Sequence, residues 1–164
     1  MMRIITKAHS LTHDEAQGNA PMADERNSYE GAFAAQHRRL NTHFEGLLEA
    51  LRAGGAPDAL RDDFRLLREA LEAHVDQEDR LYYPAVRALR PVHRPVLEEL
   101  VVAHEIFRSQ LGAIEASLAE AAFSAAERAL VEFVEGFAAH EAAEEALLRR
   151  IDAEILEALS GDPR

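Results

Sequence analysis

The sequence predicts an all-α protein, an antiparallel up-down-up-down four-helix bundle. Apolar residues recur in steps of three and four along four long segments, which is the period of a helix with one buried face. No segment alternates as a strand would, and the short links between segments place neighbouring helices antiparallel. The 164 residues are enough for one domain with its own core, which we expect to span residues 28–160.

The first half of the chain predicts an arm and two helices. Residues 1–27 lack a sustained apolar period and are expected to form a flexible N-terminal arm. The first helix starts at Ser28 and ends at the AGGAP segment. The second helix crosses Pro84, which is expected to kink or loosen it. The adjacent Tyr82 and Tyr83 are expected to pack in the core or at the surface, and a hydrogen bond from either to the polar residues described below is the alternative. The apolar stripe of the second helix is predicted at positions 60, 64, 67, 71, 74, 78, 81, 85 and 89.

The second half predicts two more helices after the proline-rich turn LRPVHRP. The SAAE segment that begins at Ser124 matches a capping box, so the fourth helix is expected to start there. The two halves echo each other, because His104 follows His37 by 67 positions and His140 follows His74 by 66. This echo indicates a duplicated helical hairpin. The stripes lie at positions 97, 100, 104, 107, 111, 114 and 118, and at 130, 133, 137, 140, 144, 147 and 151.

The composition excludes several classes of protein. A net charge of −12 repels phosphate backbones and anionic lipid, so we expect no nucleic-acid or membrane partner. The sequence has no cysteine, which excludes disulfides, iron–sulfur clusters and thiolate metal sites. Any metal must therefore bind through nitrogen and oxygen. No signal-peptide core is present near the N-terminus, and the cytoplasm is the expected compartment.

Polar residues occupy six positions of the apolar stripes. His74 and Glu78 are four residues apart, and so are His140 and Glu144. Each pair therefore shares one helix face. His37 and His74 are equidistant from the glycine turn between their helices, and Glu78 and His104 are equidistant from the proline-rich turn. Folding is thus expected to bring all six to one layer of the bundle. The six residues are His37, His74, Glu78, His104, His140 and Glu144.

The charges of such a buried layer need favourable partners, because burying an ionised carboxylate costs several kcal/mol. A hydrogen-bonded network or bound metal could supply them, and six residues in register favour metal. Four imidazoles and two carboxylates exceed the needs of one tetrahedral zinc ion and suit two ions bridged by the carboxylates and a further oxygen. Two iron ions are the first choice, with zinc or manganese as alternatives. Open coordination positions would accept a diatomic gas.

The motifs around these residues resemble the hemerythrin-like, or HHE cation-binding, family. The resemblance rests on His37, HVDQE from His74, AHEIF around His104 and HEAAEE from His140, and it covers about residues 30–155. It implies a non-haem di-iron centre with the four histidines as terminal ligands and the two glutamates as bridges. Oxygen carriers of the family have HxxxH on the third helix and HxxxxD on the fourth, which this chain lacks. It is more similar to members that repair iron centres, handle nitric oxide, or sense iron or oxygen.

Four neighbouring residues are alternative ligands or supporting groups. Glu145 lies five residues after the last histidine, the spacing of the oxygen carriers, but the stripe favours Glu144. Glu105 and Glu141 each follow a histidine and are expected to support the site or to face solvent. Arg108, one turn after the third histidine, is expected to orient a carboxylate or to reach solvent.

The predicted function is to bind, sense or scavenge oxygen or nitric oxide at a di-iron centre. Iron handling, iron-centre repair, reduction of nitric oxide or peroxide, and a purely structural metal are the alternatives. No acid or base beyond the ligands identifies an enzyme, so catalysis stays open. The sequence names no redox partner and is compatible with a monomer or a dimer.

Overall fold

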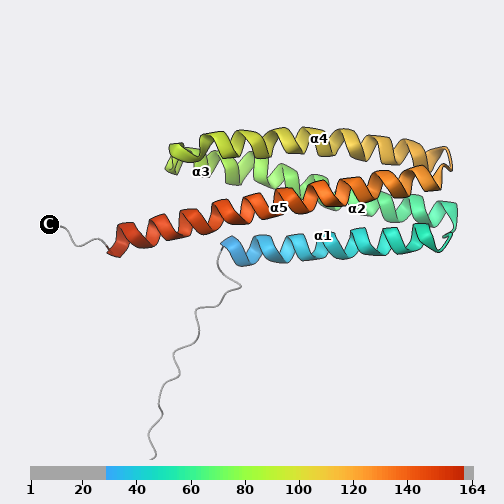
Figure 1. Cartoon of the computed structure of the whole chain (residues 1–164), viewed down its shortest axis with the longest axis horizontal. Coiled ribbons are helices and arrows are strands. Elements are labelled where there is room, and N and C mark those ends of the chain that lie inside the picture. Colours follow the sequence, from blue (N-terminus) through green and yellow to red (C-terminus); the bar gives the residue numbers. More distant parts are fainter. Residues whose placement is uncertain (1–28, 161–164) are drawn as a thin grey trace, which may run out of the picture.

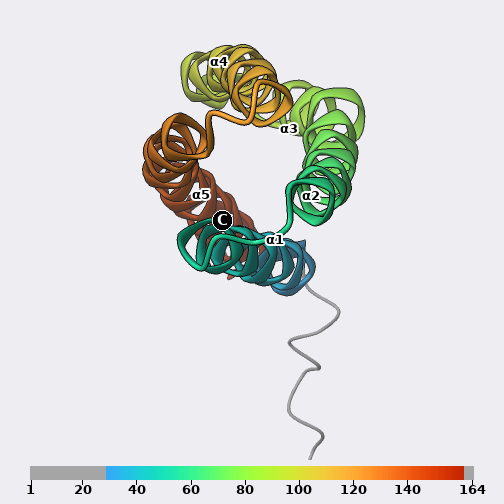
Figure 2. The same cartoon turned by 90° about the vertical axis from the view of Figure 1, so that its right-hand side faces the viewer.

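The computed structural model describes residues 29–160, which form four antiparallel rods (Figure 1). Seen end on, α1 neighbours α2 and α5, while α4 lies diagonally opposite α1 (Figure 2). No strand occurs in residues 29–160, and no helix there is long and apolar enough to cross a membrane. The prediction of an all-α four-helix bundle is confirmed, and the predicted arm, residues 1–27, lies outside the described residues. The elements are α1 (Tyr29–Arg52), α2 (Pro57–Gln77), a π-helical turn (Glu78–Tyr82), α3 (Tyr83–Leu89), a 3-10 turn (Pro91–His93), α4 (Arg94–Ala119) and α5 (Phe123–Ser160).

Both hairpin turns end the preceding helix with the same hydrogen-bonded motif. After α1, the left-handed residue is Gly54, with φ 70°, and the next N–H donates to the carbonyl of Ala50 over 2.9 Å. After α4, the left-handed residue is Ala121, with φ 55°, and the next N–H donates to the carbonyl of Ser117 over 2.8 Å. These bonds satisfy carbonyls that a helix end leaves open. Gly54 and Ala121 are 67 positions apart, which extends the echo between the two halves to their turns.

The fourth helix starts near the predicted place but without the predicted cap. α5 begins at Phe123, and two N–H groups of its first turn donate to the carbonyl of Ala122 over 2.9 and 3.0 Å. Ser124 therefore lies inside the first turn rather than at the cap position. Glu127, the other half of the predicted capping box, instead accepts a hydrogen bond of 2.8 Å from the guanidinium of Arg52 and so links α5 to α1.

The second helix departs from its predicted stripe beyond Glu78. The N–H of Tyr83 donates to the carbonyl of Glu78, five residues back, which makes this turn π-helical. Pro84 follows and has no N–H for the next α-type bond. The wider turn leaves Leu81 and Leu89 62% and 75% exposed and buries Tyr83. The predicted buried positions 81, 85 and 89 were therefore wrong, because the π turn changes the helix register by one residue.

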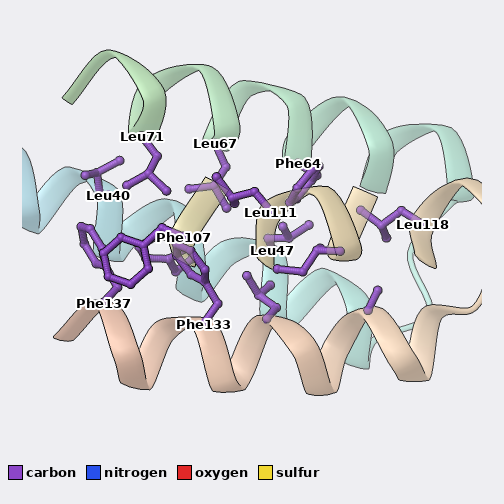
Figure 3. Close-up of a cluster of buried hydrophobic side chains, with 14 of the residues drawn as sticks. Leu40, Leu47, Phe64, Leu67, Leu71, Phe107, Leu111, Leu118, Phe133 and Phe137 are labelled. Atoms are coloured by element: carbon purple, nitrogen blue, oxygen red, sulfur yellow. The ribbon is translucent and has the colours of Figure 1, made fainter. Parts of the chain in front are cut away.

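The hydrophobic core consists of two clusters on either side of the predicted polar layer. The larger cluster fills the half of the bundle next to the hairpin turns, where Phe107, Phe133 and Phe137 pack together with leucines of the other helices (Figure 3). The ring centroids of Phe107 and Phe133 are 5.3 Å apart. The six polar residues lie between this cluster and the second one. The smaller cluster contains Tyr83, Leu97, Leu100 and Leu147.

Candidate metal centre

The six polar stripe residues meet between the two hydrophobic clusters, and each is at most 5% exposed. They come from α1, α2, the π turn, α4 and α5, so the site exists only when the whole bundle is folded. Within each of two groups, the nitrogen and oxygen atoms that could bind a metal lie within 4.8 Å of one another, and Glu78 belongs to both groups. The groups are His37, His74, Glu78 and Glu144, and Glu78, His104 and His140.

Glu78 is the central residue of the site. Its Oε1 lies 2.8 Å from Nε2 of His74, and its Oε2 lies 3.2 Å from Nε2 of His104. Both oxygens are buried, yet neither forms a hydrogen bond of good geometry within residues 29–160. Burial opposes ionisation of Glu78, but the rings of His104 and His74 outweigh it and lower the pKa to about 2. Glu78 is therefore a carboxylate whose oxygens face the two groups of ligand atoms.

Outer partners orient two of the histidine rings. Nδ1 of His74 lies 3.1 Å from Oε1 of Gln36, and Nδ1 of His104 lies 2.9 Å from Oδ1 of Asp79. In a neutral imidazole, an Nδ1–H that donates to such an oxygen leaves the Nε2 lone pair available. Both Nε2 atoms face Glu78. Rings held in this way are typical of histidines that bind metals.

Glu144 faces the same space from α5, and one of its oxygens is already held. The hydroxyl of Tyr83 donates to Oε1 over 2.9 Å, while Oε2 lies 3.4 Å from Nε2 of His37. Burial, together with nearby carboxylates, raises the pKa of Tyr83, so the phenol keeps its proton. Behind His37, Glu141 lies 3.6 Å from Nδ1 and accepts a hydrogen bond from Asn41 over 3.2 Å. Tyr83 thus packs in the core, as expected, and also forms the hydrogen bond to the site that was the alternative.

A family model described as the hemerythrin HHE cation-binding domain matches residues 31–151. This match covers most of the chain and includes all six residues of the two groups. The chain belongs to the hemerythrin HHE family. No curated protein and no solved structure matches it significantly. The family match and the two groups together make this HHE domain a metal-binding protein.

The donor set of the HHE domain fits metal cations. It offers four imidazoles and two carboxylates without sulfur, and the buried oxygens of Glu78 need a positive partner. His140 completes the second group, with Nε2 3.2 Å from Nε2 of His104. Burial, reinforced by the nearby His104, lowers the pKa of His140 to about 4, so this ring is neutral and has a lone pair for a metal at neutral pH.

The remaining sequence candidates lie around the site rather than in it. Glu145 points outward and pairs with Arg149 over 3.4 Å, so it is Glu144 that faces the histidines. The side chain of Glu105 is 72% exposed and accepts a hydrogen bond of 2.6 Å from Arg108. Arg108 also donates to Asp79 over 2.9 Å and thereby orients the carboxylate that bonds to His104.

The sequence interpretation missed Gln36 and Asp79. A signal for both was present, because Gln36 and His74 lie symmetrically about the glycine turn, and Asp79 and His104 lie symmetrically about the proline-rich turn. Residues that are symmetric about a hairpin turn come to the same level, whether or not they are buried. The choice of Tyr83 rather than Tyr82 as the tyrosine that contacts the site had no such signal, because it depends on the π turn.

Proposed function

We propose that this HHE domain holds two iron ions and binds, senses or scavenges a diatomic ligand, oxygen or nitric oxide. The observation that carries the proposal is the position of Glu78, whose two oxygens each face one group of ligand atoms. Glu78 would bridge the ions. Glu144 belongs to one group, and its Oε1 accepts the hydrogen bond of Tyr83. The proposed ligands are His37, His74, Glu78 and Glu144 for one ion, and Glu78, His104 and His140 for the other.

The surroundings of the centre suit a resident metal that meets a small gas. Bound iron would supply redox chemistry at the residues of the two groups. The hydrophobic clusters on both sides keep the site dry, which strengthens electrostatic interactions inside it. Because every proposed ligand is at most 5% exposed, we infer that the metal is retained rather than passed to other proteins.

Metal analysis and gas titration test this function. The protein is loaded anaerobically with ferrous salt, freed of excess metal and analysed by mass spectrometry, and two irons per chain are expected. Nitric oxide or oxygen is then added to the reduced protein while the visible spectrum is recorded. Zinc-loaded protein is the control, because zinc has no redox chemistry and should give no band. A reversible band supports a binder or sensor, continuous consumption of the gas supports an enzyme, and iron-loaded protein without any response contradicts the proposal.

A further inference from the structure

A groove between α4 and α5 leads from the surface to the candidate metal centre. Its volume is about 380 Å³, and its wall is mainly apolar. Small side chains from the two helices face each other across it, and a Cβ at Gly136 would still be 3.8 Å from the ring of Phe107. The lining residues include Leu100, Ala103 and Phe107 of α4, and Gly136, Ala139 and Ala143 of α5.

His140 connects this groove to the centre. The ring lines the groove, while its Nε2 lies 3.2 Å from Nε2 of His104. Its other nitrogen, Nδ1, is buried and has no hydrogen-bond partner within the described part of the chain. The contrast with His74 and His104 is clear, since Nδ1 of each is close to an outer oxygen.

A second groove reaches the centre between α1 and α2, but it suits a gas less well. It measures about 220 Å³, and its lining includes Gln36, Arg39, His43 and Gln77. Gln36 is already bonded to the ring of His74 at its inner end. Its lining is more polar than that of the groove between α4 and α5, which favours water, whereas apolar cavities stay dry and accept apolar gases such as xenon.

We propose that the groove between α4 and α5 is the route by which a neutral diatomic gas reaches the metal centre, with a first binding position beside His140. Among its lining residues only Glu99 carries a fixed charge, and this negative charge disfavours anions. The ring of Phe107 packs against His140 with centroids 5.2 Å apart, and the gas passes when the Phe107 side chain changes rotamer. The destination of the route rests on the proposed function, but binding of gas in the groove does not.

The first test uses zinc-loaded protein, which is diamagnetic and independent of iron chemistry. Dissolved oxygen is paramagnetic and speeds the relaxation of nearby methyl groups, which are observed by NMR in protein labelled at the alanine methyls. We expect a larger effect at Ala103 and Ala139 than at the exposed Ala138 and Ala142, outside the groove. The Ala139→Leu variant should reduce the effect at Ala103. Equal effects inside and outside the groove would overturn the binding position.

The second test measures the route. In iron-loaded reduced protein, Ala139→Leu should slow nitric oxide association by about tenfold in stopped-flow experiments, with an unchanged final spectrum. The matched control is Ala138→Leu, an equal change at a residue that is also exposed but does not line the groove, which should leave the rate unaltered. Equal rates in both variants would overturn the route. If iron-loaded protein shows no gas response at all, the proposed function fails, while the zinc experiment still decides whether gas binds in the groove.

Discussion

Glu78 is fully buried and ionised, which explains why histidines surround it. Burial lowers the pKa of His104, but Glu78 and Asp79 more than offset this and raise it overall, so these carboxylates favour the protonated form of the ring. A bound cation would replace that proton, because metal ligands must be deprotonated. At the scale of single residues, a proton on a histidine ring and a bound metal cation are therefore two alternative ways to compensate the buried charge of Glu78.

Replacing Glu78 by Ala should lower the bound iron from two ions per chain to one or none, because both proposed ion positions lose a ligand. Glu145→Ala is the matched control, since this glutamate, next to Glu144 on α5, points away from the site and pairs with Arg149. Metal analysis after identical loading and desalting compares the two variants. Iron loss in Glu145→Ala with full iron in Glu78→Ala would reverse the assignment of ligands.

Replacing Asp79 by Ala should weaken metal binding by about 10- to 100-fold, the usual effect of removing the group that orients a ligand histidine. The physical reason is that Asp79 holds Nδ1 of His104 at 2.9 Å. The control is Asp76→Ala, which removes a more exposed carboxylate that also lies near Arg108. Competition with a chelator of known affinity measures the change, and equal affinities in both variants would remove Asp79 from this role.

The π turn decides which residues of the second rod face the metal centre. In an α-helix, the residue after one turn from Glu78 would be Tyr82, but the wider turn places Tyr83 inward instead. This one-residue shift allows the hydroxyl of Tyr83 to donate to Glu144. At the scale of elements, Pro84 and the π turn thus act together to add a contact that a regular helix would not make.

Deleting Arg80 should convert the π turn to an α-helical turn and still leave Tyr83 inward, because Tyr83 would then follow Glu78 by four residues, one α-helical turn. Arg80 is suitable because its side chain is 76% exposed. We expect bound iron and helical content close to those of the parent protein, measured by metal analysis and circular dichroism. Inserting one alanine after Arg80 should instead rotate Tyr83 away from Glu144 by about 100° and lower the bound iron. Full iron content in the insertion variant would show that the position of Tyr83 is dispensable.

Replacing Ala121 by Gly should raise the free energy of unfolding by about 0.5–1 kcal/mol. Alanine at φ 55° is strained by about 1–2 kcal/mol, and glycine relieves this strain while losing about 0.4–1 kcal/mol through its freer unfolded chain. Denaturant unfolding measures the change. The neighbouring Ala122→Gly, where φ is not positive, should not stabilise, and equal effects at both positions would contradict this account.

The whole bundle resembles two packed cores joined by a polar layer. One cluster lies next to the hairpin turns and the other next to the turn between α3 and α4, so neither cluster spans the layer. The layer contains residues of every long rod, and metal ions bound there would hold all four together. At the scale of the molecule, the metal is therefore expected to contribute to stability as well as to function.

Removing the metal should lower the melting temperature, because metal binds the folded state only. With free metal at 100 times its dissociation constant, the loss is about 2.7 kcal/mol. For a domain of this size that corresponds to on the order of 10 °C. Calorimetry before and after chelation measures the shift, and Glu78→Ala should show a much smaller one. An unchanged melting temperature of the parent protein would favour a purely hydrogen-bonded layer.

Much of the fold and the membership of the polar layer follow from local signals in the sequence. Apolar steps of three and four predict four helices, glycines and prolines mark their ends, and equal distances from the turns bring His37 opposite His74. These inferences succeed because helix geometry ties sequence spacing to position in space. The preference for Glu144 over Glu145 as the inward residue follows in the same way.

The sequence by itself thus determined the helices, their order and the level at which six polar residues lie. Only the tertiary structure decided the π turn, the contact of Tyr83 with Glu144 and the partners of the histidine Nδ1 atoms. The physical reason is that spacing predicts the face and height of a residue in a regular helix. Which atom a side chain presents, and where a helix gains a residue per turn, depend on packing against the other three rods.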